Sequence, residues 1–97
     1  MLVPEEFKYL TRCFWDGSHQ EAKSLPEWVS NAVRLLDVRQ KAVVQPFLDD
    51  VLSRNLPDNE LQRIWNDGGA RYCFPDPNEL RRVLAMIRDK LAASGGR

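Results

Sequence analysis

The sequence predicts an all-α fold, a compact single-domain bundle of about five helices that takes up the whole chain of 97 residues. Three observations lead to this class. Apolar residues recur at helical spacing in five segments. Helix-start patterns precede three of those segments, and no alternating β pattern of useful length occurs. The core is expected to span about residues 4–92, and residues 93–97 are expected to fray as a tail.

The first helix is predicted over about residues 4–15. Its first turn suits a proline followed by acidic residues, because proline has the right backbone angle and the helix dipole favours negative charge there. One face is apolar at spacings of three and four residues, with Phe7, Leu10 and Phe14. The turn signal Asp16-Gly17 is expected to end the helix.

A second helix is predicted to open at Ser24, because Glu27 follows three positions later and completes a capping-box pattern. Its buried face is expected to be Trp28, Val29, Ala32, Val33 and Leu36. Both Trp28 and Trp65, which lie on apolar stripes, are expected in the core.

A third helix is predicted to start after Asp37, with Gln40 in the matching position, and to run to about Arg54. The side chains expected to face inward are Val43, Val44, Phe47, Leu48, Val51 and Leu52. Pro46 lies inside this pattern and removes one backbone hydrogen bond. We therefore expect a single bent helix over about residues 38–53.

Two further helices complete the pattern. The segment "LPDNELQRIWNDGG" predicts a short helix that buries Leu61, Ile64 and Trp65 and stops at Gly68-Gly69. The segment "FPDPNELRRVLAMIRDKL" predicts the last one, with Asp76 as cap, Pro77 as first residue and Glu79 completing a capping box. Its buried stripe is expected to be Leu80, Val83, Leu84, Ile87 and Leu91.

Composition narrows the classes of function. The 14 basic and 14 acidic residues cancel, which argues against nucleic acid as the main partner. No stretch is apolar enough for a membrane helix, and the N-terminal residues do not resemble a signal peptide. Two cysteines, Cys13 and Cys73, suit reduced and buried thiols of a cytoplasmic protein, although the sequence leaves a disulfide between them open. Localisation is therefore expected to be cytoplasmic.

Catalytic and metal chemistry find little support in the sequence. Cys13, Asp16, His19 and Glu21 lie close together but match no standard zinc spacing. A cysteine nucleophile beside His19 would need an orienting third group. The neighbouring carboxylates Asp49-Asp50 diverge on a helix, so they form no acid–base pair. We expect no catalytic, metal-binding or cofactor-binding residues. We therefore expect that the protein is not an enzyme.

Charge is unevenly placed along the second half of the chain. Residues 57–79 carry Asp58, Glu60, Asp67, Asp76 and Glu79, whereas residues 80–97 are mainly basic, with Arg81, Arg82, Arg88, Lys90 and Arg97. One interpretation is that the two segments neutralise each other across the fold. The other is that one of them faces a charged partner.

The order of the elements resembles a small all-helical family of immunity proteins from bacterial contact-dependent growth inhibition systems. The resemblance covers about residues 7–91. It rests on the helix "FKYLTRCF", the triplet His19-Gln20-Glu21, the segment "FLDDVLSR", the helix "LPDNELQRIW", the Gly-Gly-x-x-Tyr segment ending at Tyr72, and the closing helix "LRRVLAMIRDKL". The chain departs from the family around the triplet, where Gly17-Ser18 and Ala22 replace aromatic residues.

The resemblance implies a cytosolic binding protein that blocks the toxin domain of a cognate effector, often a nuclease. A nuclease offers a basic groove, so acidic residues would serve best. The residues expected to bind the partner are Trp15, Asp16, His19, Glu21, Asp58, Glu60 and Asp67, with Phe14 anchoring the loop and His19 also fixing its shape. Two alternatives stay open: a helical adaptor for another protein, and a weak nucleic-acid binder that uses the basic last helix.

Overall fold

The computed structural model describes residues 3–14, 22–70 and 72–95, and these ranges contain α-helices and no strand. The all-α prediction is therefore confirmed. The helices are α1 (Glu5–Arg12), α3 (Leu25–Arg34), α4 (Val38–Ser53), α5 (Asp58–Asp67) and α6 (Pro77–Gly95). The radius of gyration of 12.3 Å is close to the roughly 12.5 Å expected for a compact chain of this length.

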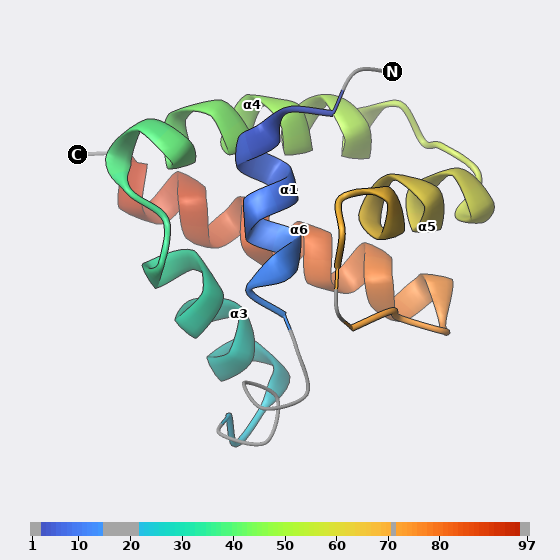
Figure 1. Cartoon of the computed structure of the whole chain (residues 1–97), viewed down its shortest axis with the longest axis horizontal. Helices are drawn as coiled ribbons and strands as arrows, with labels where there is room; N and C mark the ends of the chain where they lie inside the picture. The colour runs from blue at the N-terminus through green and yellow to red at the C-terminus, as the bar shows by residue number, and fades with distance from the viewer. Residues whose placement is uncertain (1–2, 15–21, 71, 96–97) are drawn as a thin grey trace.

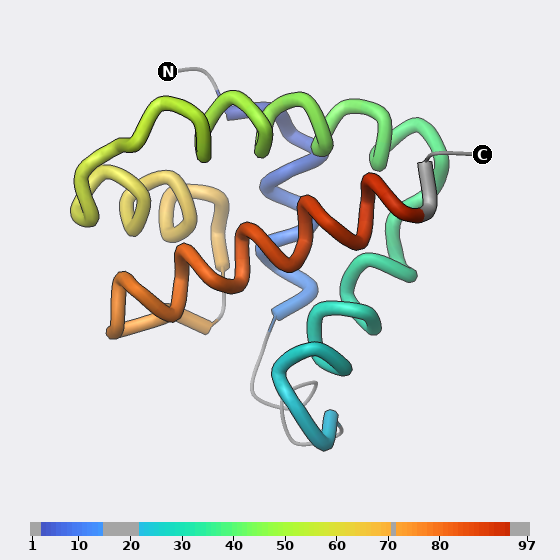
Figure 2. The backbone as a smooth tube through the Cα atoms, turned by 180° about the vertical axis from the view of Figure 1, so that it is seen from behind, coloured from blue at the N-terminus to red at the C-terminus, as the bar shows by residue number. Residues whose placement is uncertain are grey.

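Helix α6 is the central helix of the bundle, because it packs against α3, α4 and α5. Helix α1 lies across the opposite side and contacts α4 and α5. Figure 1 shows α1 in front of α6, and the reverse view in Figure 2 shows α6 in front of α1. The core therefore lies between these two helices, and α3, α4 and α5 close its edges.

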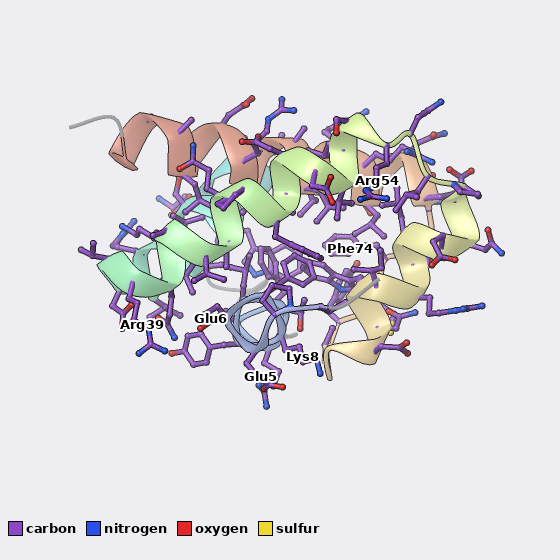
Figure 3. All side chains as sticks on the ribbon, turned by 90° about the horizontal axis from the view of Figure 1, so that it is seen from above. Glu5, Glu6, Lys8, Arg39, Arg54 and Phe74 are labelled. Atoms are coloured by element: carbon purple, nitrogen blue, oxygen red, sulfur yellow. The ribbon has the colours of Figure 1, made fainter. Side chains whose placement is uncertain are left out.

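An aromatic cluster forms the centre of this core. The ring of Phe14 lies 5.0 Å from that of Trp28 and 5.2 Å from that of Trp65, measured between centroids. Phe74, at the middle of the molecule in Figure 3, completes the group at 5.3 Å from Trp65. The edge-to-face arrangement that predominates in the cluster is favoured by the ring quadrupoles. The core positions expected for Trp28, Trp65 and Phe14 are confirmed.

Most residues of the predicted apolar stripes are also buried. Every stripe residue expected on α3, α5 and α6 lies in the core, as do Val44, Leu48 and Val51 of α4. Phe47 and Leu52 pack against it while partly exposed. Val43, which was also expected to face inward, is only half-buried. Helix α4 continues through Pro46 without interruption, which confirms the prediction of one helix. The expected bend at this proline stays a prediction.

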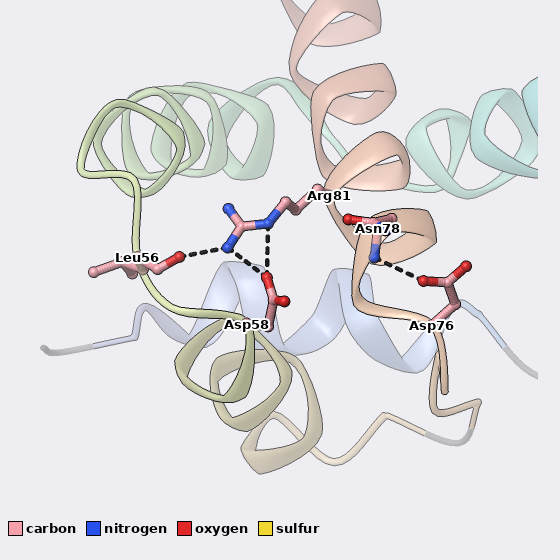
Figure 4. Close-up of polar contacts among 5 residues, drawn as sticks. All are labelled: Leu56, Asp58, Asp76, Asn78 and Arg81. Atoms are coloured by element: carbon pink, nitrogen blue, oxygen red, sulfur yellow. Dashed lines mark hydrogen bonds and ion pairs between the residues drawn. The ribbon is translucent and has the colours of Figure 1, made fainter.

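Side-chain caps set the starts of three helices. The Ser24 hydroxyl accepts from the Glu27 backbone N–H, but the Glu27 carboxylate reaches back to the N–H of Lys23 rather than to that of Ser24. Before α4, Asp37 and Gln40 form the complete reciprocal box that the sequence predicts. At α6 the Asp76 carboxylate accepts from the N–H of Asn78 (Figure 4). The bonds donated by the N–H groups of Glu27, Gln40 and Asn78 each satisfy a first-turn donor that has no partner within its helix.

Two expectations need correction. Helix α1 ends at Arg12 rather than near residue 15, because the N–H groups of Cys13 and Phe14 bond to carbonyls three residues back and tighten the last turn. Cys73 is exposed rather than buried. It stands in non-helical backbone between half-buried Tyr72 and buried Phe74, whose side chains turn toward the core, and the residue between them turns outward. Both cysteines are thiols, so no disulfide joins them.

A close helix contact depends on a glycine. A Cβ atom added to Gly68 would lie 2.8 Å from Oγ1 of Thr11 and 3.3 Å from the Cα of Lys8. The missing side chain therefore lets the end of α5 approach α1. The next residue, Gly69, has a φ of +86°, the left-handed conformation in which helices commonly end. Gly68 therefore permits the close contact between α5 and α1, whereas Gly69 supplies the left-handed residue that follows the helix.

Candidate protein-binding surface

Four of the predicted partner-binding residues, Trp15, Asp16, His19 and Glu21, lie outside the described residues. So does the turn Asp16-Gly17. On the near side of this segment, Phe14 is fully buried, as expected for an anchor. The other three, Asp58, Glu60 and Asp67, lie on α5, and the structure separates them.

Asp58 is engaged within the molecule. Its Oδ1 atom accepts from Arg81 of α6, at 2.7 Å from one terminal nitrogen and 3.1 Å from Nε (Figure 4). The same terminal nitrogen also donates to the carbonyl oxygen of Leu56. Arg81 thus joins the α4–α5 connection to the last helix. For this pair, the acidic segment and the basic helix do neutralise each other.

Glu60 and Asp67 lie on the opposite flank of α5. A helix turns about 100° per residue, which places both of them roughly 180° around the axis from Asp58. Leu61, Ile64 and Trp65 are buried between the two flanks. The acidic residues that are grouped in the sequence therefore form no single surface.

Some basic residues of α6 form ion pairs within the protein, and others are exposed. Arg81 binds Asp58, and Arg88 pairs with the neighbouring Asp89 at 3.2 Å. Arg82 and Lys90 are exposed. A phosphate backbone would be bound best by a continuous row of uncommitted cations. This division weakens the nucleic-acid alternative.

Within the described ranges, no group of three or more His, Cys, Asp or Glu side chains could hold a metal ion. Cys13 is a poor nucleophile: burial raises the pKa of its thiol, and the nearby charge of Arg12 only partly opposes that effect. Its Sγ atom donates to the carbonyl oxygen of Tyr9, 3.4 Å away. No helix in these ranges combines the length and apolarity needed to cross a membrane.

Three large apolar side chains of the described residues are exposed, and two of them flank the connection between α3 and α4. Leu35 is the C-cap residue that follows α3 and is 60% exposed. Val38 is the first residue of α4 and is 84% exposed. Tyr9 of α1, 41% exposed, lines a groove together with Asp37, which stands between these two residues in the chain. Because three residues span at most about 10 Å, Leu35 and Val38 are close neighbours.

The groove beside Tyr9 has a volume of about 420 Å³ and carries both signs of charge. Its walls come from α1 and from the start of α4. Arg39 pairs with Glu6 across it at 3.5 Å, and Figure 3 shows the two side by side. The Arg39 side chain is 84% exposed, whereas that of Glu6 is only 20% exposed. The corner surface is defined as this groove with its two apolar neighbours: Glu5, Glu6, Tyr9, Arg12, Leu35, Asp37, Val38, Arg39 and Gln40.

The corner surface has the make-up of a protein interface. Such interfaces have an apolar centre in which aromatic residues are enriched, arginine is favoured, and charged groups stand at the rim. The sequence pattern did not reveal it, because the surface joins residues from α1 and from the α3–α4 connection. One signal was present: Leu35 and Val38 are large apolar residues outside the predicted stripes, on either side of a helix cap.

Comparison with protein-family models, with curated proteins and with solved structures found no match for this chain.

Proposed function

We propose that this protein is an immunity protein, which binds the toxin domain of a cognate contact-dependent growth inhibition effector and blocks it in the cytoplasm. The observation that carries the proposal is the corner surface, where Tyr9, Leu35 and Val38 are exposed beside a charged groove. The sequence resemblance supplies the class of partner.

Neutralisation would follow from occupancy alone. The toxin would cover Leu35 and Val38. Removal of their apolar surface from water would contribute to the free energy of binding. Arg39 would stay at the rim, where its exposed guanidinium can exchange Glu6 for a carboxylate of the partner. Asp67 and Glu60 would act at longer range, by drawing a basic toxin toward the protein.

The test is a growth assay in which the polypeptide encoded beside this gene, as the candidate toxin, is co-expressed with the protein. Wild-type protein should restore growth and should co-purify with the toxin. The double variant Leu35→Asp/Val38→Asp should lose both effects, because it places two charges in the apolar part of the corner surface. Both positions are exposed, so its melting temperature should stay within a few degrees of wild type.

Ala92→Asp is the matched control, since it adds a carboxylate at an exposed position of α6. It should protect cells as well as wild type does. Failure of the wild-type protein to protect against the neighbouring toxin, or to bind it, would refute the proposed function. Full protection by the double variant would move the binding site away from the corner surface.

A further inference from the structure

A second concave site lies between the start of α3, the 72–74 segment and α6, away from the corner surface. It has a volume of about 210 Å³. Its lining includes three aromatic residues, one carboxylate and one lysine: Trp28, Tyr72, Phe74, Glu79 and Lys23, together with Leu25. This site is called the aromatic pocket.

The aromatic side of the pocket is built from rings that hold one another in place. The centroid of Tyr72 lies 5.1 Å from that of Trp28 and 4.9 Å from that of Phe74, with interplanar angles of 77° and 78°. Trp28 and Phe74 are buried, whereas Tyr72 is half-buried. Tyr72 is therefore the ring that a ligand would meet first.

The backbone of the 72–74 segment is fixed by side chains of α5. The indole N–H of Trp65 donates to the carbonyl oxygen of Tyr72 at 2.8 Å, and the Gln62 amide donates to that of Phe74 at 3.1 Å. Because both bonds come from one helix, the wall is held in place before any ligand arrives. Such preorganisation lowers the entropy cost of binding.

Glu79 supplies the charge of the pocket. Its side chain is half-buried, and none of the ion pairs formed among the described residues involves it. Lys23, the cation of the lining, is exposed and can turn into solvent. A carboxylate beside aromatic rings favours a cation, and partial burial strengthens that attraction relative to a fully exposed pair.

We infer that the aromatic pocket receives an arginine side chain of the partner protein, with its guanidinium on the Glu79 carboxylate and against the ring of Tyr72. A volume of about 210 Å³ is below the roughly 300 Å³ at which pockets for small-molecule ligands begin, but it suits one side chain. Arginine fits better than lysine because its planar group stacks on rings and is less strongly hydrated. The identity of the partner rests on the proposed function, whereas the chemistry of the pocket does not.

The pocket is tested first with small probes. N-acetyl-arginine amide, N-acetyl-lysine amide and N-acetyl-citrulline amide are titrated into the protein while the indole N–H signal of Trp28 is followed by NMR. The arginine probe should shift this signal saturably. The citrulline probe, which has nearly the same shape without the charge, should bind at least about tenfold more weakly, with lysine in between. Equal shifts from arginine and citrulline, or no shift from arginine, would overturn the inference.

Two substitutions locate the effect. Glu79→Gln keeps the shape of the side chain and should remove the preference for arginine over citrulline. Asp49→Asn, which removes the same charge at an exposed position of α4 outside the pocket, should leave that preference intact. Loss of the preference in both variants would show that the probes sense the overall charge of the protein rather than this pocket.

The same variants separate the inference from the proposed function. With the toxin domain as ligand, Glu79→Gln should raise the Kd about tenfold while Asp49→Asn changes it less than about threefold. If the toxin binds and Glu79→Gln has no effect, the pocket is not used and the proposed function stands. If the toxin does not bind but the arginine probe does, the proposed function fails and the pocket chemistry stands.

Discussion

The two cysteines show how little residue type says about environment. Cys13 is in the core and donates its thiol hydrogen to the carbonyl oxygen of Tyr9, whereas Cys73 is exposed. A free cysteine is most often buried, and on that basis the sequence predicted burial for both. The difference comes from backbone: Cys13 follows the last turn of a helix on its buried side, and Cys73 lies between two aromatic residues that turn inward.

This difference predicts selective labelling. At pH 8, iodoacetamide should modify Cys73 quickly and Cys13 at least about a hundredfold more slowly, because Cys13 is buried and its raised thiol pKa leaves less thiolate. Mass spectrometry of peptides from the timed reaction measures both rates. In denaturant the two rates should converge. Equal rates in the native protein would contradict the buried position of Cys13.

At the scale of single elements, the helices were predictable because their signals are local. Spacing of apolar residues and the caps at Ser24, Asp37 and Asp76 lie within a few positions of the helix that they define. The contacts between helices were not predictable in this way. The approach of Gly68 to Thr11, for example, joins residues 57 positions apart, and the sequence shows only a helix stop there.

This approach gives a second prediction. Gly68→Ala should cost about 1–3 kcal/mol of unfolding free energy, because its Cβ would be too close to the Thr11 hydroxyl. In a Thr11→Ala background the cost of the same change should fall by at least about 0.5 kcal/mol, since the clashing oxygen is gone. Chemical denaturation of the four proteins measures this coupling.

Gly69→Ala serves as the control for that cycle. Its cost of about 1–2 kcal/mol should come from the positive φ and should be the same in both backgrounds, because its nearest contacts belong to Arg12 instead. Additive costs for Gly68→Ala and Thr11→Ala would show that the two helices do not meet as described.

At the scale of the whole molecule, charge links segments that are distant in sequence. Arg81 bonds to both Asp58 and the carbonyl oxygen of Leu56, so one side chain holds the α4–α5 connection against the last helix. The sequence suggested that acidic and basic segments face each other, but not which residues pair. It named both Asp58 and Glu60 as partner-binding residues, and α5 carries the two on opposite flanks.

Arg81→Met should therefore lower stability by about 1–2 kcal/mol, a modest value because the ion pair is partly exposed. For a domain of this size that corresponds to a fall in Tm of very roughly 4–16 °C. Arg82→Met, at the next and exposed position, should change Tm by no more than a few degrees. Thermal unfolding followed by circular dichroism checks both, and equal losses in the two variants would contradict the link.

The candidate site was less accessible to sequence analysis than the fold. Tyr9, Leu35 and Val38 come from two separate stretches, and their common feature is exposure, which only the packing of the other residues reveals. Phe14 was the exception, since its place on an apolar face predicted the anchor that the aromatic cluster confirms. A surface consists of the residues that packing leaves exposed, and these can come from any element, so it has no local signature in the sequence.

The central claim, that the protein blocks a toxin by binding it through the corner surface, is tested most directly by calorimetric titration with the polypeptide encoded beside its gene as the candidate toxin. We predict a one-to-one complex with a Kd below about 1 μM, weakened at least about tenfold by Leu35→Asp/Val38→Asp and unchanged by Ala92→Asp. The absence of binding by the folded wild-type protein would contradict the claim, and so would a double variant that binds as tightly as wild type.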